Sequence, residues 1–247
     1  MAAVALAAPL QSQPRLEPHD ARFWLAASAL LAAAAAHDAS LSADASRNQR
    51  TIVARLAGEL EPVGRERYAV PVLGGAWLVS RLAGGGRASR AVLRIAAGYF
   101  AADFLTTALK TGLGRHRPDT LGGGAWRFRP LSGQAEWHAL PSGHAAHAFA
   151  LAAAVSDEVG SRTVAVAAYG VAALVGWQRV VSRSHWPSDV VAGALVGVVV
   201  ARTTGRWLRR GPLGEEPSDV RQPSRHRDVR VAIAPGILVV TVPARSP

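Results

Sequence analysis

Residues 178–201 read QRVVSRSHWPSDVVAGALVGVVVA, a polar cluster followed directly by an apolar run rich in Gly, Ala and Val. The apolar run predicts a helix, and the cluster with its Ser, Arg and Pro residues predicts a loop that leads into it. Five more apolar segments are separated by polar loops that carry Gly or Pro: 23–36, 68–80, 91–109, 145–156 and 163–178. The sequence therefore predicts an all-α fold, a six-helix bundle, with a further short helix around 48–60.

The six apolar segments raise the question of a membrane. A span needs about 20 predominantly apolar residues, and most of the uncharged runs here are shorter. Six clustered apolar helices nevertheless favour a transmembrane bundle, and the alternative is a soluble all-α bundle in the periplasm. Basic residues outside the polar clusters are more frequent in the loops of one side, which places that side in the cytoplasm. We predict a location in the bacterial inner membrane, with the polar clusters facing the periplasm or exterior.

The composition changes at both ends of the helical region. Residues 1–20 begin apolar and then become polar, so they are interpreted as a leader or signal-like segment. We assign 21–210 to a helical domain and 211–247 to a linker and a small C-terminal β-hairpin. The hairpin is expected within 229–243, VRVAIAPGILVVTVP, where β-rich runs flank a Pro-Gly turn.

Charge and cysteine content narrow the chemistry. The 247 residues include 28 Lys plus Arg against 17 Asp plus Glu, a net charge of +11, and no cysteine. The lack of cysteine excludes a disulfide framework, a Cys-ligated metal site and a thiol nucleophile. The positive charge favours phosphates or an anionic membrane surface as partners. Nucleic acid is disfavoured, because the basic residues are dispersed and no binding motif is present.

Three polar clusters interrupt the apolar pattern, and each lies at a predicted helix end. They read KTGLGRHRP at 110–118, PSGH at 141–144 and RVVSRSHWPSD at 179–189. If consecutive helices run antiparallel, an even number of crossings separates the clusters, and all three fall at the same end of the bundle. The cationic and imidazole side chains that would meet there are Lys110, Arg117, His144, Arg179 and His185.

Fixed cations and backbone N–H groups at a helix N-terminus form a site for a tetrahedral oxyanion. Ser142 and Gly143 open the helix that follows them, so we expect their amides to face the ligand. Two histidines add a possible nucleophile and a possible acid. Asp189 follows His185 by four residues, and we expect it to hold one ring nitrogen and present the other.

Together the clusters resemble the three-part signature of the type 2 phosphatidic acid phosphatase superfamily, which also includes the vanadium haloperoxidases. In that signature Lys is followed after six residues by Arg-Pro, and Pro-Ser-Gly-His comes next. Ser-Arg, five residues, His, three residues and Asp complete it. The chain keeps every element and gap, except that Gln178 stands where the family usually has Ser. The resemblance covers roughly residues 90–205.

The resemblance implies a six-helix core and metal-independent hydrolysis of phosphate esters through a phosphohistidine, with no cofactor. By position, His185 would be the nucleophile and Asp189 would orient it. His144 would protonate the leaving oxygen and then activate water. The groups that would hold the phosphoryl oxygens each offer an N–H, N–H₃⁺ or O–H donor: Lys110, Arg117, Ser142, Gly143 and Arg179. Arg115 and Arg183 would lie behind the site or on the surface.

The predicted function is hydrolysis of a lipid phosphate or diphosphate: undecaprenyl diphosphate, phosphatidate or phosphatidylglycerol phosphate. The alternatives are a soluble periplasmic acid phosphatase of broad specificity and a vanadium haloperoxidase. Partners would be the lipid substrate and the membrane, and the oligomeric state is left open.

Overall fold

A computed structural model describes residues 18–119, 124–211 and 213–214, together with the backbone of 230–234 and 237–241. The chain divides into two units, residues 1–214 and 215–247. Most of the predicted leader, 1–20, lies outside the described residues. The same holds for most of the predicted linker.

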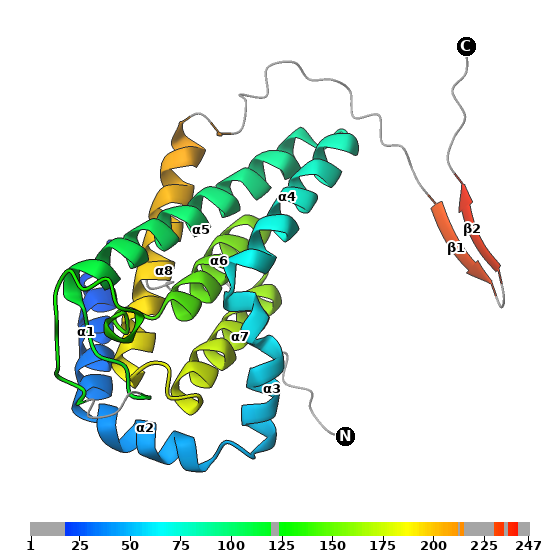
Figure 1. The fold of residues 1–247 in the computed structure, drawn as a ribbon. Coiled ribbons are helices and arrows are strands. Elements are labelled where there is room, and N and C mark those ends of the chain that lie inside the picture. Colours follow the sequence, from blue (N-terminus) through cyan, green and yellow to red (C-terminus); the bar gives the residue numbers. More distant parts are fainter. Residues whose placement is uncertain (1–17, 120–123, 212, 215–229, 235–236, 242–247) are drawn as a thin grey trace, which may run out of the picture. The chain divides into compact units, whose positions relative to one another are not determined.

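The first unit is helical, and its described residues contain eight α-helices (Figure 1). They are α1 Ala21–Ala36, α2 Asp38–Arg47, α3 Ile52–Leu60, α4 Glu66–Leu82, α5 Gly86–Leu113, α6 Gly143–Val159, α7 Arg162–Val181 and α8 Pro187–Arg210. Two 3-10 turns, Glu61–Gly64 and Ala135–Trp137, complete the list. The helical class is as predicted. Six of the helices overlap the six predicted apolar segments, while α2 and α3 lie between the first two.

Local sequence explains several helix ends. Ser142 and Ser161 precede α6 and α7, and each side chain accepts a hydrogen bond from the backbone N–H three residues on. Pro187 begins α8, where its missing N–H has no helical partner to lose. Gly114 and Gly160 end α5 and α6 in the left-handed conformation.

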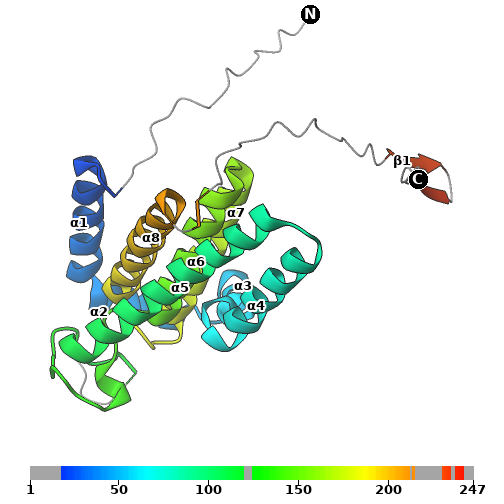
Figure 2. The ribbon, with the colours of Figure 1, turned by 90° about the horizontal axis from the view of Figure 1, so that it is seen from above.

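Helix α6 is the centre of the unit. It contacts α5, α7 and α8, while α1 packs on α8 and α4 on α5 (Figures 1 and 2). The α6–α8 contact is close because α8 has glycine where the backbones meet. A Cβ added at Gly193 would lie 2.3 Å from the carbonyl oxygen of Ser142, and one at Gly197 would lie 2.3 Å from that of Ala146. This contact fixes the start of α8 against the start of α6.

Within the described part of the chain, three helices are long and apolar enough to cross a membrane: α5, α7 and α8. Helices α1 and α2 pass the same test only as a pair, and they are bent by 70° at the break between them. Helices α1, α4 and α6 have 16 or 17 residues and fall short of a full span by themselves. Length therefore supports fewer spans than the six that the sequence predicts.

In the second unit, strands β1 (Arg230–Ala234) and β2 (Ile237–Thr241) pair antiparallel, with Arg230 opposite Thr241 and Ala234 opposite Ile237. The residues that join them, 235–236, lie outside the described part of the chain. The β-hairpin stays a prediction.

Candidate functional site

The loop after α5 depends on one glycine. Gly114 has a φ of 62°, and a Cβ added there would lie 1.8 Å from the carbonyl oxygen of Arg129. Its backbone N–H donates to the carbonyl of Lys110 at 3.0 Å and closes the last turn of the helix. Only glycine fits this position, and the turn leads the chain from Lys110 toward Arg117.

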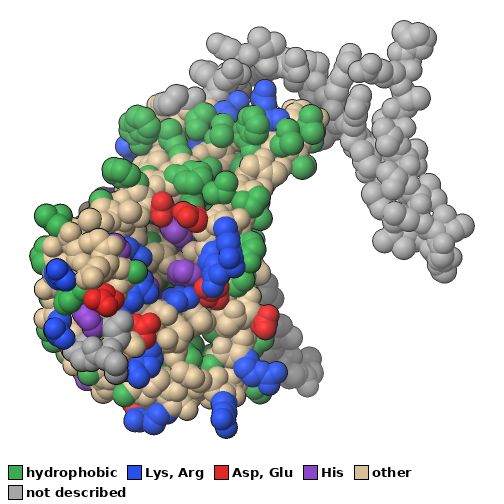
Figure 3. Space-filling model, in the orientation of Figure 1, with side chains coloured by type: hydrophobic (Ala, Val, Ile, Leu, Met, Phe, Trp, Pro, Cys, Tyr) green, Lys and Arg blue, Asp and Glu red, His purple; other side chains and the backbone are tan. Residues whose placement is uncertain are grey.

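Direct contacts bring the three polar clusters together at one end of the helical unit. The backbone N–H of Ser142 donates to the carbonyl oxygen of Asp189 at 2.8 Å. The ammonium of Lys110 ends beside Gly143, where an added Cβ would lie 3.1 Å from Nζ. Figure 3 shows His, Lys or Arg, and Asp or Glu side chains around a hollow, below hydrophobic side chains that lie over α4 and α5.

His185 lies in the loop between α7 and α8, and its side chain is buried. Nδ1 lies 2.7 Å from the carbonyl oxygen of Ala139. Because a carbonyl can only accept, Nδ1 carries the hydrogen and Nε2 carries the lone pair. Nε2 makes no hydrogen bond within the described part of the chain. The backbone thus fixes the tautomer in which Nε2 carries the lone pair.

Asp189 does not hold His185 in the way that the sequence predicts. Its Oδ2 lies 3.8 Å from Nδ1 of His185, beyond hydrogen-bond distance. The two carboxylate oxygens accept other hydrogens instead, from Nη1 of Arg115 at 2.6 Å and from the backbone N–H of Trp186 at 2.8 Å. A carboxylate in the first turn of a helix is well placed to accept hydrogen bonds from such backbone N–H groups. The imidazole of His185 instead donates to the carbonyl of Ala139.

Of the two predicted places for Arg115, the structure has the one behind the site: the residue is 1% exposed and contacts α2 and α8. Nη2 donates to Oδ2 of Asp38 at 2.6 Å, and Nη1 reaches both Asp189 and Oγ of Ser188. Asp38, at the start of α2, also accepts the backbone N–H of Ser188 at 2.9 Å. We call Asp38, Arg115, Ser188 and Asp189 the buried ion network. Sequence reasoning missed Asp38, whose only signal is an acidic residue directly after an Ala-rich helix.

Three cations surround His185. Burial lowers the pKa of this imidazole well below its ordinary value, and the positive charges of Lys110, Arg117 and Arg179 lower it further. Nε of Arg117 donates to the carbonyl of Ala135 at 3.0 Å, which fixes its guanidinium. Nε of Arg179 is buried and makes no hydrogen bond within the described residues. The arrangement is cationic around a neutral histidine, as a phosphate site requires.

His144 starts α6 beside a carboxylate that the sequence did not single out. Its Nε2 lies 2.9 Å from Oε1 of Glu61, which also accepts from Nη1 of Arg179 at 2.9 Å. Burial, followed by the charge of Arg179, lowers the pKa of His144, and the charge of Glu61 opposes that shift. In the sequence, Glu61 is distinguished only by being an acidic residue in the polar stretch before the second predicted helix.

Two further positions of the third cluster can now be placed. Oε1 of Gln178 is buried and has no hydrogen-bond partner within the described residues, so this amide is not committed to the neighbouring backbone. Arg183 is exposed, as predicted, and donates from Nη2 to the carbonyl of Pro118 at 2.9 Å.

A polar cavity of about 400 Å³ opens beside Lys110, Gly143 and His144. The rest of its lining comes from the segment 64–67, from α5 and from His147 of α6. One of the residues from α5, Thr106, has a buried hydroxyl without a hydrogen-bond partner among the described residues. The lining can therefore meet a hydrophilic group next to the cations.

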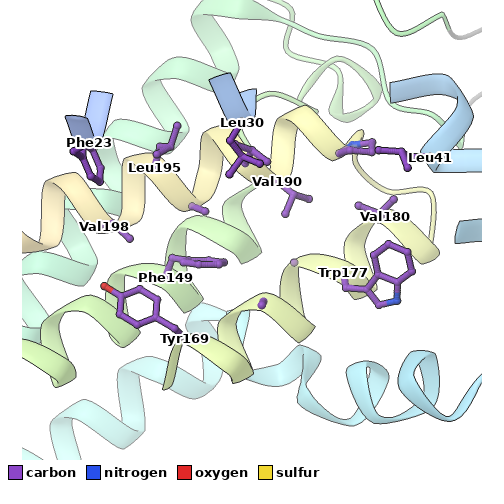
Figure 4. Close-up of a pocket in the computed structure, with 15 residues that line it drawn as sticks. Phe23, Leu30, Leu41, Phe149, Tyr169, Trp177, Val180, Val190, Leu195 and Val198 are labelled. Atoms are coloured by element: carbon purple, nitrogen blue, oxygen red, sulfur yellow. The ribbon is translucent and has the colours of Figure 1, made fainter. Parts of the chain in front are cut away.

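An apolar groove of about 440 Å³ lies between α1, α6, α7 and α8 (Figure 4). Figure 4 shows Phe23 and Leu30 of α1 across from Leu195 of α8. At one end the groove is lined by Val180 and Pro187, which flank the loop that carries His185. Two residues at this end of the groove are therefore near His185 in the sequence.

Comparison with known proteins points to one family. Residues 91–211 match the family model described as the PAP2 superfamily. The lipid A 1-phosphatase of Porphyromonas gingivalis is 38% identical over 106 residues, which are 42% of this chain and 20% of that protein. The lipid A 1-phosphatase of Rhizobium etli is 38% identical over 94 residues, 38% of this chain and 40% of that protein. The chain thus spans well under half the length of these curated relatives.

Two solved structures share the fold. LpxE of Aquifex aeolicus superposes with a TM-score of 0.54 and 20% identity, over 68% of this chain and 94% of that one. A transmembrane PAP2 type phosphatidylglycerolphosphate phosphatase of Bacillus subtilis gives a TM-score of 0.59 and 20% identity, over 77% of this chain and 96% of that one.

Proposed function

The chain belongs to the PAP2 superfamily through residues 91–211, and we propose that it hydrolyses a lipid phosphate or diphosphate without a metal ion, by way of a phosphohistidine on His185. The observation that carries the proposal is a neutral histidine with Nδ1 pinned by a carbonyl, surrounded by Lys110, Arg117 and Arg179. Phosphoryl transfer needs mainly positioning and stabilisation of charge, and these groups supply both.

In the first half-reaction Nε2 of His185 attacks the phosphorus, and the bond from phosphorus to the lipid oxygen breaks. His144 gives its proton to that oxygen. In the second half-reaction His144 takes a proton from water, whose oxygen attacks the phosphorus and frees inorganic phosphate from Nε2. Asp189 acts through Arg115 and the backbone of the helix start rather than by a hydrogen bond to His185.

The charges of the transferred group are met by donors from all three clusters. Lys110, Arg117 and Arg179 carry the positive charge that would balance the phosphoryl oxygens. Ser142 and the Gly143 amide lie at the start of α6, where the helix end favours an anion.

Two spaces, the apolar groove and the polar cavity, support a lipid as the substrate class. An acyl or prenyl chain in the apolar groove would enter past Val180 and Pro187 and bring its head group to His185. The polar cavity would take the rest of the head group. Undecaprenyl diphosphate, phosphatidate and phosphatidylglycerol phosphate fit this description, and the names of the curated relatives add lipid A 1-phosphate.

The location that suits this substrate is the bacterial inner membrane, with the site facing the periplasm. Helices α5, α7 and α8 are apolar enough to cross a membrane, which supports embedding in the bilayer. The surplus of basic residues in the opposite loops supports that orientation.

The test is phosphate release from each of these lipids in detergent with excess EDTA, with a soluble aryl phosphate alongside. Hydrolysis of one or more lipids that survives EDTA is the expected result. Activity on the aryl phosphate alone would favour a soluble acid phosphatase, and no release from any substrate would contradict the proposal.

A further inference from the structure

A carboxylate outside the three motifs touches two of their residues. Glu61 opens the 3-10 turn Glu61–Gly64, which precedes the segment matched by the family. Its Oε1 lies 2.9 Å from Nε2 of His144 and 2.9 Å from Nη1 of Arg179. Its side chain is 10% exposed and also pairs with Nε of Arg65 at 2.7 Å. The contacts are thus made to the proposed acid and to one of the phosphate-binding cations.

The turn that carries Glu61 fits closely against the start of α6. A Cβ added at Gly64 would lie 2.9 Å from Cβ and 3.0 Å from Cδ2 of His144. The carbonyl of Gly64 also lies 2.9 Å from Nδ1 of His147, one turn further along α6. Packing and hydrogen bonds therefore set the distance between Glu61 and His144.

The carboxylate of Glu61 does not line the polar cavity, although it contacts a residue that does. Lys110, Gly143 and His144 line the polar cavity of about 400 Å³, whereas Glu61 is not among its lining residues. Arg65 and Arg179 neutralise the carboxylate from two other elements. Glu61 therefore contacts His144 from outside this cavity.

The bond to Glu61 decides which nitrogen of His144 can exchange protons. The hydrogen bond from Arg65 and the charges of His144, Arg65 and Arg179 keep the pKa of Glu61 below its ordinary value, although burial alone would raise it. An ionised carboxylate only accepts, so Nε2 of His144 must carry a hydrogen. Nδ1 makes no hydrogen bond within the described part of the chain.

We infer that Glu61 is a positioning residue, which holds His144 by Nε2–H and leaves Nδ1 to exchange protons with the leaving group and with water. This inference rests on the proposed function. When the lipid oxygen leaves, the proton on Nδ1 moves to it and the ring becomes neutral, with Nε2–H still donated to Glu61. In the second half-reaction Nδ1 takes a proton from water, and Glu61 stays ionised throughout.

The charge of Glu61 matters as well as its geometry. His144 is buried near Arg179, and both effects disfavour its protonated form. The nearby carboxylate is the charge that opposes them, so His144 without Glu61 would hold the acidic proton less often. Removing the charge of Glu61 should therefore lower kcat/KM most for substrates whose leaving oxygen depends on protonation.

The experiment compares Glu61→Gln with wild type on two substrates that differ in leaving group. Phosphatidate releases an alkoxide, which needs protonation, whereas 4-nitrophenyl phosphate releases a stabilised phenolate. We expect kcat/KM to fall about 10²-fold for phosphatidate and less than about 10-fold for 4-nitrophenyl phosphate, because general acid catalysis contributes about 10²–10⁴-fold. The matched control is Glu59→Gln, the same change at an exposed position of α3, which should leave both values unchanged.

A second readout uses no aryl substrate. Breakdown of the phosphoenzyme also needs Nδ1, so Glu61→Gln should slow the decay of labelled phosphoenzyme by a factor similar to that for phosphatidate. If Glu61→Gln folds poorly, Glu61→Asp keeps the charge and should restore much of the activity on phosphatidate relative to that on 4-nitrophenyl phosphate. Thermal unfolding of each variant separates loss of fold from loss of proton transfer.

Other results would overturn the inference. An equal loss on both substrates would give Glu61 a general structural role. Higher activity, or tighter inhibition by inorganic phosphate, would mean that the carboxylate competes with the phosphoryl group. Unchanged leaving-group dependence and phosphoenzyme decay would remove Glu61 from the reaction. If wild type releases phosphate from none of the substrates, the proposed function itself fails, and this inference fails with it.

Discussion

The two histidines of the site lie in different surroundings. His185 is buried, pinned by a backbone carbonyl, and lies beside the fully buried ion network of Asp38, Arg115, Ser188 and Asp189. His144 faces a polar cavity and is held by a single carboxylate on a short turn. The difference fits their proposed tasks: a nucleophile gains from one fixed tautomer, whereas an acid that becomes a base needs a nitrogen open to substrate and water.

The largest expected effect is the loss of the nucleophile. His185→Ala should reduce phosphate release from a lipid substrate by at least about 10³-fold, because it removes the side chain that is proposed to form the phosphohistidine. Release is measured in detergent at saturating substrate. Substantial residual hydrolysis by His185→Ala would contradict the assignment of the nucleophile to this side of the site.

The next effect tests whether the buried side is as rigid as its contacts indicate. Arg115→Met removes the cation that pairs with Asp38 and Asp189 and leaves two buried carboxylates without it. Removing one partner of a buried ion pair destabilises a protein by about 3–5 kcal/mol, so the midpoint of thermal unfolding should fall clearly. Arg183→Met is the control at an exposed position and should change stability by less than about 1 kcal/mol. Equal midpoints for the two variants would show that the network is not structural.

A smaller effect concerns the space next to each histidine. Ala173→Trp places a large side chain in the apolar groove that ends near His185, so it should raise KM for a long-chain lipid phosphate about 10-fold. KM for a soluble aryl phosphate should not change, since that substrate has no chain to place. Val166→Trp, on an exposed part of α7, is the control. An equal rise for both substrates would mean that the groove does not hold the lipid chain.

The smallest effect is on pH dependence. The pKa of His185 is lower in the folded protein than its ordinary value of 6.5, so the unfolded chain binds more protons as pH falls through 6.5. Stability contributed by neutral His185 is therefore present above that pH and is lost below it, toward the lowered folded value. His185→Asn should reduce the fall in unfolding midpoint between about pH 7.5 and about pH 5.5 by a few degrees, since 1 kcal/mol shifts it by about 2–4 °C.

His144 sharpens this comparison. Glu61 offsets part of the shift at His144, whereas no carboxylate makes a hydrogen bond to His185 among the described residues. His144→Asn should therefore change the pH dependence of stability less than His185→Asn does. The opposite order would contradict the different surroundings that the structure gives the two histidines.

Sequence reasoning predicted the helical class and the end at which the clusters meet, because both follow from local apolar runs and from antiparallel connection of helices. It placed Lys110, Gly143 and Asp189 in one region. In the structure Lys110 lies beside Gly143, and the carbonyl of Asp189 accepts a hydrogen bond from the residue that precedes Gly143. Sequence reasoning left Arg115 either behind the site or on the surface, and it did not predict that Arg115 contacts Asp38 or that Glu61 contacts Arg179, because those partners are far apart in the chain and outside any fixed spacing.

The role of Asp189 shows a second limit of spacing. Four residues separate it from His185, which predicts a contact on one helical turn. The two residues are instead divided by the helix boundary at Pro187, and the carboxylate accepts the backbone N–H of Trp186. The backbone N–H groups at a helix start and a nearby imidazole can both hydrogen-bond to the same carboxylate. Spacing in the sequence does not show which of the two does so.

The most direct test of the central claim is to trap the covalent intermediate. Wild-type protein is mixed with phosphatidate labelled in its phosphate, in detergent with excess EDTA, and quenched under alkaline conditions that preserve phosphohistidine. We expect label on the peptide that contains His185 in wild type and none on that peptide in His185→Ala. Label on another residue, or phosphate release by wild type with no labelled protein at any time, would contradict it.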